Sequence, residues 1–232
     1  MSSPKLTLVA ATRLAETAFW SQSALGLSLR RLQADDRLVP RITFSNSRGL
    51  PLIYNAATED ASASEWVLFV HDDVWFDDFF LMDHVHQGLQ AFDVIGVAGN
   101  RRRQPRQPGW AFTSRAPDGR FVWDDKAFLS GTVAHGRTPF GRLSRFGPSE
   151  VGCELLDGVF LAARRSRLLD TGVRFDPRFS FHFYDLDFCR SARDHGLSLG
   201  TWPVALTHQS GGAFGSAAWE AAWKLYLEKW GD

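Results

Sequence analysis

The first hundred residues alternate between short strand-like runs and segments with helical periodicity. Four runs have the length and composition of β-strands: 6–10, 41–44, 66–70 and 94–98. Three segments between them place apolar residues at helical spacing: 15–33, 51–63 and 79–91. Because parallel strands require crossover connections, this alternation predicts an α/β fold with a mostly parallel sheet that has helices on both faces.

The remainder of the chain interrupts this pattern and then resumes it. Residues 100–115 are polar and contain two prolines, and residues 119–148 combine glycines with short β-type runs, which predicts a β-rich or irregular insertion. Ordered elements are expected again, as strands or extended chain at 155–163 and 199–206 and as helices beginning near Ser166 and spanning 184–195 and 217–229. With no visible linker, residues 1–232 are interpreted as one domain, in which the regular α/β half at 1–99 is followed by a second half at 100–232 that contains the insertion.

The composition excludes several classes of protein. The 26 basic and 26 acidic residues balance, which argues against a dedicated nucleic-acid-binding protein. Cys153 and Cys189 form no CxxC pair, so we expect buried free thiols in a reducing compartment. No run reaches the roughly 20 apolar residues of a membrane span, and the apolar run near the N-terminus is too short for a signal-peptide core. A cytoplasmic protein is expected, and its oligomeric state is left open.

An acidic cluster follows directly after one predicted buried strand, in the stretch VLFVHDDVWFDD. Ligands of open α/β sheets bind beyond the carboxyl ends of the strands, where His71, Asp72 and Asp73 would lie. Because side chains two apart share a face of an extended chain, Asp73 should lie on the side of His71, and Asp72 elsewhere unless the strand has already turned there. Two interpretations stay open here: capping of the next helix, and oxygen ligation of Mg²⁺ or Mn²⁺, with the imidazole favouring Mn²⁺.

Two later stretches also carry residues capable of chemistry. Asp185 and Asp187 fall in the first turn of a predicted helix, where carboxylates stabilise the helix dipole. The aromatic stretch FSFHFY before Asp185 suggests a buried carboxylate with a further role. His208 follows a strand-like run and precedes Gly211 and Gly212, and a single histidine in such a place is more often structural.

Taken together, these stretches resemble a known family. The order is an apolar strand entering a DxD-type acidic motif, then LLDGVFLAARRS, then YDLDFC with its following helix, and then HQSGG. This order resembles family 2 glycosyltransferases of the GT-A fold, and within them the group similar to the streptomycin-biosynthesis protein F. The resemblance extends from Leu6 to the KLYLEKW stretch near the end of the chain.

The resemblance implies a metal-dependent, inverting transfer of a sugar from a nucleoside diphosphate sugar, with a UDP-sugar favoured, to the hydroxyl of a saccharide or other acceptor. Asp73 and His208 would ligate Mn²⁺ or Mg²⁺, which neutralises the diphosphate leaving group. Asp185 would act as the catalytic base. The residues expected to bind the nucleotide sugar are Thr12, Asn46, Arg48, Asn55 and Asp72. Asp157 would lie in the wall that faces the donor sugar or the acceptor. Residues 1–99 would then form the nucleotide-binding half and residues 100–232 the acceptor-side half. Synthesis of bacterial surface polysaccharide is the role the family suggests.

The chain departs from the family pattern at three places. His71 occupies the first acidic position of the DxD-type motif, although its last acid is kept as Asp73. Tyr184 stands where the family usually has a glutamate before the aspartate that is Asp185. The second strand ends in Ser45-Asn46-Ser47, and not in the usual Asp-rich turn that contacts the nucleotide.

Other functions remain open on the sequence. A nucleotidyltransferase would share the strand–helix pattern, but LVAATRLAE lacks the glycine-rich and basic loop expected after its first strand. A metal-dependent hydrolase would be expected to show a dense ligand run such as HxHxD. The altered motifs also fit a catalytically inactive relative that binds sugar or nucleotide. Residues 100–115 could form a flap that orders on donor binding and turns its arginines toward anionic groups, or a plain surface loop.

Overall fold

The computed structural model of the chain describes residues 4–212 and 214–231, and its central feature is a mixed sheet. Its strands have the spatial order β13 (Leu199–Thr201), β5 (Val94–Gly96), β12 (Phe160–Arg164), β3 (Trp66–Val70), β1 (Leu6–Ala11) and β2 (Leu38–Thr43). β2, β1 and β3 are parallel, as are β13 and β5, whereas β12 runs antiparallel between β3 and β5. The predicted α/β class with a mostly parallel sheet is confirmed.

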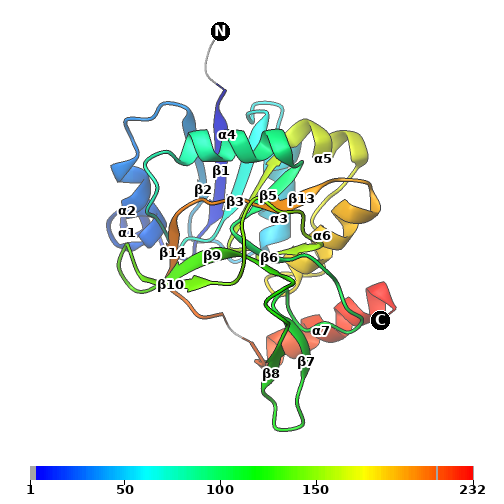
Figure 1. Cartoon of the computed structure of the whole chain (residues 1–232). Helices are drawn as coiled ribbons and strands as arrows, with labels where there is room; N and C mark the ends of the chain where they lie inside the picture. The colour runs from blue at the N-terminus through cyan, green and yellow to red at the C-terminus, as the bar shows by residue number, and fades with distance from the viewer. Residues whose placement is uncertain (1–3, 213, 232) are drawn as a thin grey trace.

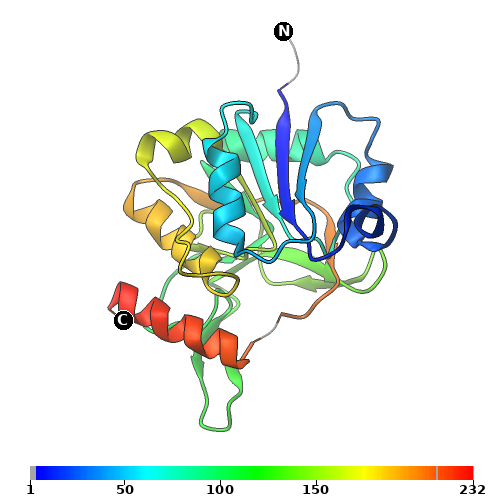
Figure 2. The same cartoon turned by 180° about the vertical axis from the view of Figure 1, so that it is seen from behind.

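Helices cover both faces of this sheet, as the alternating sequence predicts. The helices are α1 (Glu16–Gln22), α2 (Ala24–Arg31), α3 (Leu50–Glu59), α4 (Leu81–Ala91), α5 (Arg165–Thr171), α6 (Tyr184–Asp194) and α7 (Ala217–Trp230). In Figure 1 α4 crosses in front of the sheet, and in Figure 2 α3 lies in front of it, so these two helices cover opposite faces. Every residue of β3 is therefore buried, which explains its uninterrupted apolar sequence.

The single helix predicted over residues 15–33 is two helices. The hydroxyl of Ser23 donates to Phe19 O at the end of α1 and accepts from Gly26 N at the start of α2, so one side chain serves both helix ends. A Cβ on Gly26 would lie 2.2 Å from Phe19 O, so only glycine permits this close turn. Apolar spacing continues across the break, which is why periodicity did not locate it.

A second sheet lies beyond the first and has the order β11 (Leu155–Leu156), β6 (Ala98–Asn100), β9 (Leu129–His135), β14 (Leu206–His208) and β4 (Val74–Phe76), with β10 (Arg142–Arg145) paired to β9. The strands predicted at 94–98 and 155–163 each divide between the two sheets, as β5 and β6 and as β11 and β12. The extended stretch 199–206 likewise divides into β13 and β14. An apolar run is buried whichever of the two sheets it joins, so its composition does not show at which residue the chain passes from one sheet to the other.

The second half of the chain, residues 100–232, adds a hairpin and the last helix. β7 (Phe112–Arg115) and β8 (Phe121–Trp123) pair antiparallel, and in Figures 1 and 2 they lie with α7 beyond the carboxyl ends of β1 and β3. The expectation that 100–115 lacks regular structure is wrong at both ends, since Asn100 ends β6 and Phe112 begins β7. Buried apolar residues from both halves form one cluster.

Two further expectations concern cysteines and membrane spans. Cys153 and Cys189 are both buried and free, as predicted. None of the helices described between residues 4 and 231 has the length and apolar character needed to cross a membrane.

Candidate active site

Strand pairing brings His208 next to the acidic cluster. β14 runs antiparallel to β4 with His208 opposite Val74, and Gln209 N donates to Asp73 O over 3.0 Å. His71, Asp73 and His208 can each offer a ligand atom such that all three atoms lie within 4.8 Å of one another. The structure thus places the two predicted ligands, Asp73 and His208, together, and adds His71 from the end of β3.

The residues of this group fit a divalent cation. Oδ1 of Asp73 is buried and accepts no hydrogen bond from any described residue, although it lies 3.3 Å from Nε2 of His208. Buried carboxylate oxygens are rarely left without a partner, and a cation between the carboxylate and the imidazoles would provide one. Burial alone would raise the pKa of Asp73, but the imidazoles of His208 and His71 outweigh it and lower that pKa to about 2.

The two imidazoles of the group differ in their protonation. Burial lowers the pKa of His71, and the charge of Asp73 offsets this only in part. For His208, the carboxylate of Asp73 outweighs burial, so the pKa of His208 is raised. A metal ligand must present a free nitrogen lone pair, so protons compete with a metal for His208 more than for His71.

A loop between the two sheets lies beside this group. β12 is antiparallel to β3 with Phe160 opposite Val70, so the preceding loop lies next to His71. Within it, Gly158 N donates to Oδ2 of Asp185 over 3.0 Å. A Cβ on Gly158 would lie 2.5 Å from the hydroxyl oxygen of Tyr184 and 2.8 Å from Cβ of Asp185, so this position requires glycine. The glycine of LLDGVF therefore lets the loop contact the start of α6 directly.

Asp185 has the electrostatic environment of a proton acceptor. Burial, followed by the negative charge of Asp157, raises the pKa of Asp185 to about 7. A carboxyl with a pKa near neutrality is suited to general-base catalysis, because it is a stronger base than an ordinary carboxylate and is still ionised in a large fraction of molecules. Phe183, which precedes α6, adopts the left-handed conformation with φ of 64°. Such strain in a non-glycine residue costs on the order of 1 kcal/mol and is often found beside functional groups.

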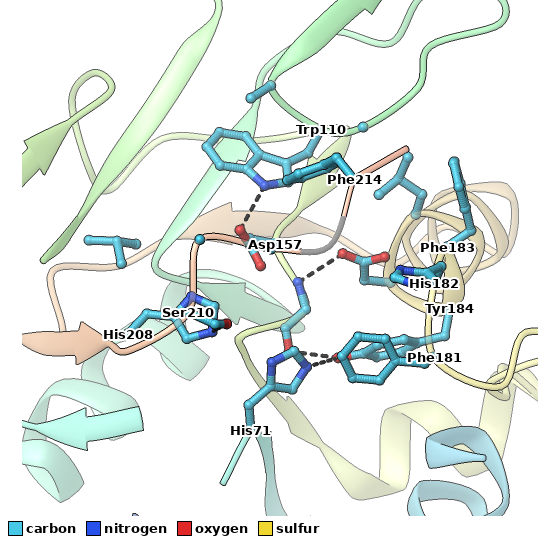
Figure 3. Close-up of a pocket in the computed structure, with 18 of the residues that line it drawn as sticks. His71, Trp110, Asp157, Phe181, His182, Phe183, Tyr184, His208, Ser210 and Phe214 are labelled. Carbon is cyan, nitrogen blue, oxygen red and sulfur yellow. Dashed lines mark hydrogen bonds between the residues drawn. The ribbon is translucent and has the colours of Figure 1, made fainter. Parts of the chain in front are cut away.

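Asp157 is held in the wall of the cavity by two donors. Its Oδ2 accepts from Nε1 of Trp110 over 2.7 Å, and its Oδ1 accepts from Val159 N over 2.9 Å. Figure 3 shows the Trp110 indole over Asp157, on the far side of the cavity from His71. Nothing in the sequence linked Trp110 to Asp157, since they are 47 residues apart and the segment around Trp110 has no periodicity.

These groups line one cavity of about 720 Å³. Asp72, Asp73, Asp157, Asp185 and His208 all contribute to its wall, so five of the predicted site residues come together there. Its lining also includes many aromatic side chains for which the sequence predicts no binding role: Trp110, Phe112, Trp123, Phe146, Phe181, Phe183, Phe214 and Trp219. Trp110, Phe181, Phe183 and Phe214 are among the labelled side chains of this lining in Figure 3.

The other predicted donor-binding residues do not line this cavity, and each has a local contact. Oγ1 of Thr12 accepts from Leu14 N, and the side-chain amide of Asn46 bonds to both backbone groups of Arg48. The amide of Asn55 bonds to the backbone N and O of Phe175 over 2.9 and 2.7 Å. Because none of these residues lines the cavity, their predicted contacts with the nucleotide stay predictions. They are Thr12, Asn46, Arg48 and Asn55.

The arginines after β6 have structural contacts too. Arg102 forms an ion pair with Asp124, whose side chain is buried, and its guanidinium lies 3.6 Å from the centre of the Phe128 ring. Arg101 N donates to Phe128 O over 2.8 Å. Arg102 is thus engaged with the protein itself, and the expectation that the arginines turn toward anionic groups on donor binding stays a prediction.

Comparison with known proteins locates the fold. No protein-family model matches the sequence, and no curated protein matches it. Among solved structures, the chain is similar to a mannosyltransferase from Pyrobaculum calidifontis in complex with GDP-Man and Mn²⁺, at 13% identity and a TM-score of 0.48, covering 94% of this chain and 60% of that one. It is also similar to S. aureus TarS, at 16% identity and a TM-score of 0.48, covering 88% and 60%.

A third solved structure gives a higher TM-score. GalNAc-T7 with UDP, GalNAc and Mn²⁺ matches at 12% identity and a TM-score of 0.51, covering 97% of this chain and 48% of that one. The chain therefore spans between 48% and 60% of the length of these three proteins. At such identities the likeness concerns the fold alone. The chain has the mixed α/β fold of GT-A glycosyltransferases.

Proposed function

We propose that this protein is an inverting glycosyltransferase that moves a sugar from a nucleoside diphosphate sugar to an acceptor hydroxyl. The observation that carries the proposal is that the metal-ligand group of His71, Asp73 and His208 shares one cavity with Asp185, whose pKa is about 7. Glycosyl transfer by single displacement needs both, because a diphosphate must leave from one side of the sugar and a proton must be removed on the other.

The metal-ligand group, Asp185 and the residues around them would then have distinct roles. Asp73 and His208, with His71, would hold Mn²⁺ or Mg²⁺, and the bound ion supplies Lewis-acid stabilisation of the diphosphate. Asp185 would take the proton of the acceptor hydroxyl as its oxygen attacks the anomeric carbon. Gly158 N holds Oδ2 of Asp185 in place, and Asp157 keeps the basicity of Asp185 high through its negative charge. The aromatic side chains would exclude water and offer flat faces to sugar rings.

An inactive binding relative is less well supported by these observations. A protein that only bound a sugar or nucleotide would gain nothing from keeping a carboxyl unfavourably buried, beside a second carboxyl, with its pKa near neutrality. Stability is normally reduced by such an arrangement, as is common at catalytic sites.

Two measurements test the proposal: a screen for the donor nucleotide, and the configuration of the anomeric carbon in the product. GalNAc-T7, whose fold this chain shares, was solved with UDP, GalNAc and Mn²⁺, so UDP-sugars are the first donors to examine, with GDP- and dTDP-sugars after them. Thermal stability with each nucleoside diphosphate, with and without Mn²⁺, should rise for one base in a metal-dependent way. Nuclear magnetic resonance of the product with the chosen donor should then show an inverted anomeric carbon. A retained configuration would contradict the role given to Asp185.

A further inference from the structure

Two of the positions at which this chain departs from the pattern it resembles are in contact. His71 replaces the first acid of the DxD-type motif, and Tyr184 replaces the glutamate before Asp185. Although they are 113 residues apart, Nε2 of His71 lies 2.8 Å from the hydroxyl oxygen of Tyr184. Figure 3 shows this contact at the base of the cavity. Two substitutions that meet at hydrogen-bond distance suggest one functional unit, and the inference below rests on the function proposed above.

The hydrogen bonds of Tyr184 determine which nitrogen of His71 carries a proton. The tyrosine hydroxyl donates to Gly158 O over 2.8 Å, and a carbonyl oxygen can only accept. Because a hydroxyl has one proton, its oxygen must accept from Nε2–H of His71. A tyrosine hydroxyl, with an ordinary pKa of about 10, keeps its proton at neutral pH. A neutral His71 therefore has its proton on Nε2 and its free lone pair on Nδ1.

Packing holds this arrangement in place. The Tyr184 side chain is buried, and its ring lies among those of Tyr54 and Phe175 at centroid distances of 5.9 Å each. The ring of Phe181 is stacked on the imidazole of His71 at 5.6 Å and 26°. The loop also packs directly against the hydroxyl, since a Cβ on Gly158 would lie 2.5 Å from the hydroxyl oxygen of Tyr184.

We propose that Tyr184 is a positioning residue that orients His71 through Nε2, so that Nδ1 of His71 becomes a third metal ligand beside Asp73 and His208. The site would then have two imidazoles and one carboxylate. Mg²⁺ prefers oxygen ligands, whereas imidazole suits transition metals such as Mn²⁺ and Co²⁺. The consequence is a site that selects Mn²⁺ or Co²⁺ over Mg²⁺, in which the tyrosine and the histidine depend on each other.

Metal affinities measured without substrate turnover test this coupling. Calorimetric titration with Mn²⁺ and with Mg²⁺, at saturating nucleoside diphosphate, should be made on four proteins: wild type, Tyr184→Phe, His71→Asp and the double variant. Partners that orient metal ligands typically contribute about 10- to 100-fold in affinity, so Tyr184→Phe should weaken Mn²⁺ binding by that factor. In the His71→Asp background the same change should have no effect, because no imidazole is left to orient.

The single variant His71→Asp tests the selectivity. It should lower the ratio of Mn²⁺ to Mg²⁺ affinity by about tenfold or more, because it replaces a nitrogen ligand with an oxygen ligand. His135→Asp is the matched control for added charge, because His135 lines the same cavity but does not belong to the metal-ligand group. Tyr226→Phe is the control for loss of a buried hydroxyl, since Tyr226 is buried, does not line the cavity, and has its hydroxyl 3.4 Å from Arg190.

The outcomes separate this inference from the proposed function. If Tyr184→Phe costs the same Mn²⁺ affinity in both backgrounds, Tyr184 is merely structural and the inference is wrong, while the transferase proposal stands. A shift of the metal ratio in His135→Asp equal to that in His71→Asp would also overturn it. Absence of divalent-metal binding by the wild type would overturn both proposals. Should Tyr184→Phe fail to fold, ¹⁵N resonances of metal-free wild-type His71 decide, and a proton on Nδ1 contradicts the inference.

Discussion

The cavity holds two carboxylates that lie in opposite electrostatic environments. Asp73, at the end of β3, is next to two imidazoles, and its pKa is lowered to about 2. Asp185, in the first turn of α6, is buried, and burial together with the negative charge of Asp157 raises its pKa to about 7. Asp73 is therefore ionised at any physiological pH, whereas Asp185 can gain and lose a proton near neutrality.

This difference shows that the surroundings, and not the residue type, assign the roles. A permanently ionised carboxylate is suited to hold a cation, and one with a pKa near 7 is suited to move a proton. The loop of Asp157 and Gly158 separates the two, since Gly158 N bonds to Asp185 and Gly158 O accepts from Tyr184 on the side of His71. The cavity therefore has a metal end, at Asp73, and a proton-transfer end, at Asp185. A variant at one end should leave the properties of the other end unchanged.

The largest effect is expected for Asp185→Asn. The amide has nearly the same shape but cannot accept the acceptor proton, so transfer should fall by about 10²–10⁴-fold. Mn²⁺ affinity should stay at the wild-type value, because the metal end is intact. Steady-state kinetics and metal titration measure the two quantities. Asp187→Asn is the control, since Asp187 lies on the same helix and bonds to Lys229 and Trp230 outside the cavity. Near-normal transfer by Asp185→Asn would remove Asp185 from catalysis.

The second prediction concerns the pH dependence of stability. The pKa of Asp185 is about 7 in the folded protein and 3.8 in the unfolded chain. The contribution of Asp185 to the free energy of unfolding is therefore fully present below about pH 4 and is lost as the pH rises to about 7. Relative to wild type, Asp185→Asn should therefore gain up to about 4 kcal/mol across this window, at about 1.4 kcal/mol per pH unit. Asp73→Asn should show the opposite sign, with its loss relative to wild type disappearing between about pH 4 and 2. Urea unfolding at several pH values measures both. If the free energy of unfolding of both variants changed with pH in the same way, Asp73 and Asp185 would not lie in opposite electrostatic environments.

A third expectation isolates the metal end. Asp73→Asn should weaken Mn²⁺ binding by more than about 100-fold, which exceeds the effect of losing a residue that only orients a ligand. The free-energy contribution of Asp185 to the pH dependence should be unchanged. Calorimetry with Mn²⁺ measures the affinity, and Asp72→Asn is the neighbouring control. Equal losses in the two variants would mean that general negative charge, and not ligation by Asp73, attracts the metal.

The smallest effect is expected for Trp110→Phe. This change removes the donor to Oδ2 of Asp157, and a hydrogen bond to a charged group contributes about 1.5 kcal/mol or slightly more to stability. Chemical unfolding measures that loss, and Mn²⁺ affinity should not change, because Trp110 lies on the far side of the cavity from His71 in Figure 3. A fall in Mn²⁺ affinity would show that the two ends of the cavity are not independent.

The residues of the cavity differ in how clearly the sequence indicates them. Asp73 and Asp185 follow features that a sequence shows directly, an apolar strand that ends in acids and an aromatic approach to a helix start. For His71, the sequence indicates an imidazole that favours Mn²⁺ and a two-residue spacing that places it on the side of Asp73, but it assigns only Asp73 and His208 as ligands. Trp110 could not be found, because its contact with Asp157 depends on how an aperiodic segment crosses the cavity.

Periodicity and strand length are local properties, so the amino-acid sequence is enough to predict the alternation of strands and helices, the burial of β3 and the acidic motif at its carboxyl end. Long-range packing is needed to see which strands change sheets, that His208 lies opposite Val74, and that Tyr184 contacts His71. The pKa difference between Asp73 and Asp185 belongs to this second group. Burial and neighbouring charge fix a pKa, and both arise from residues that are distant in the chain and meet only after folding.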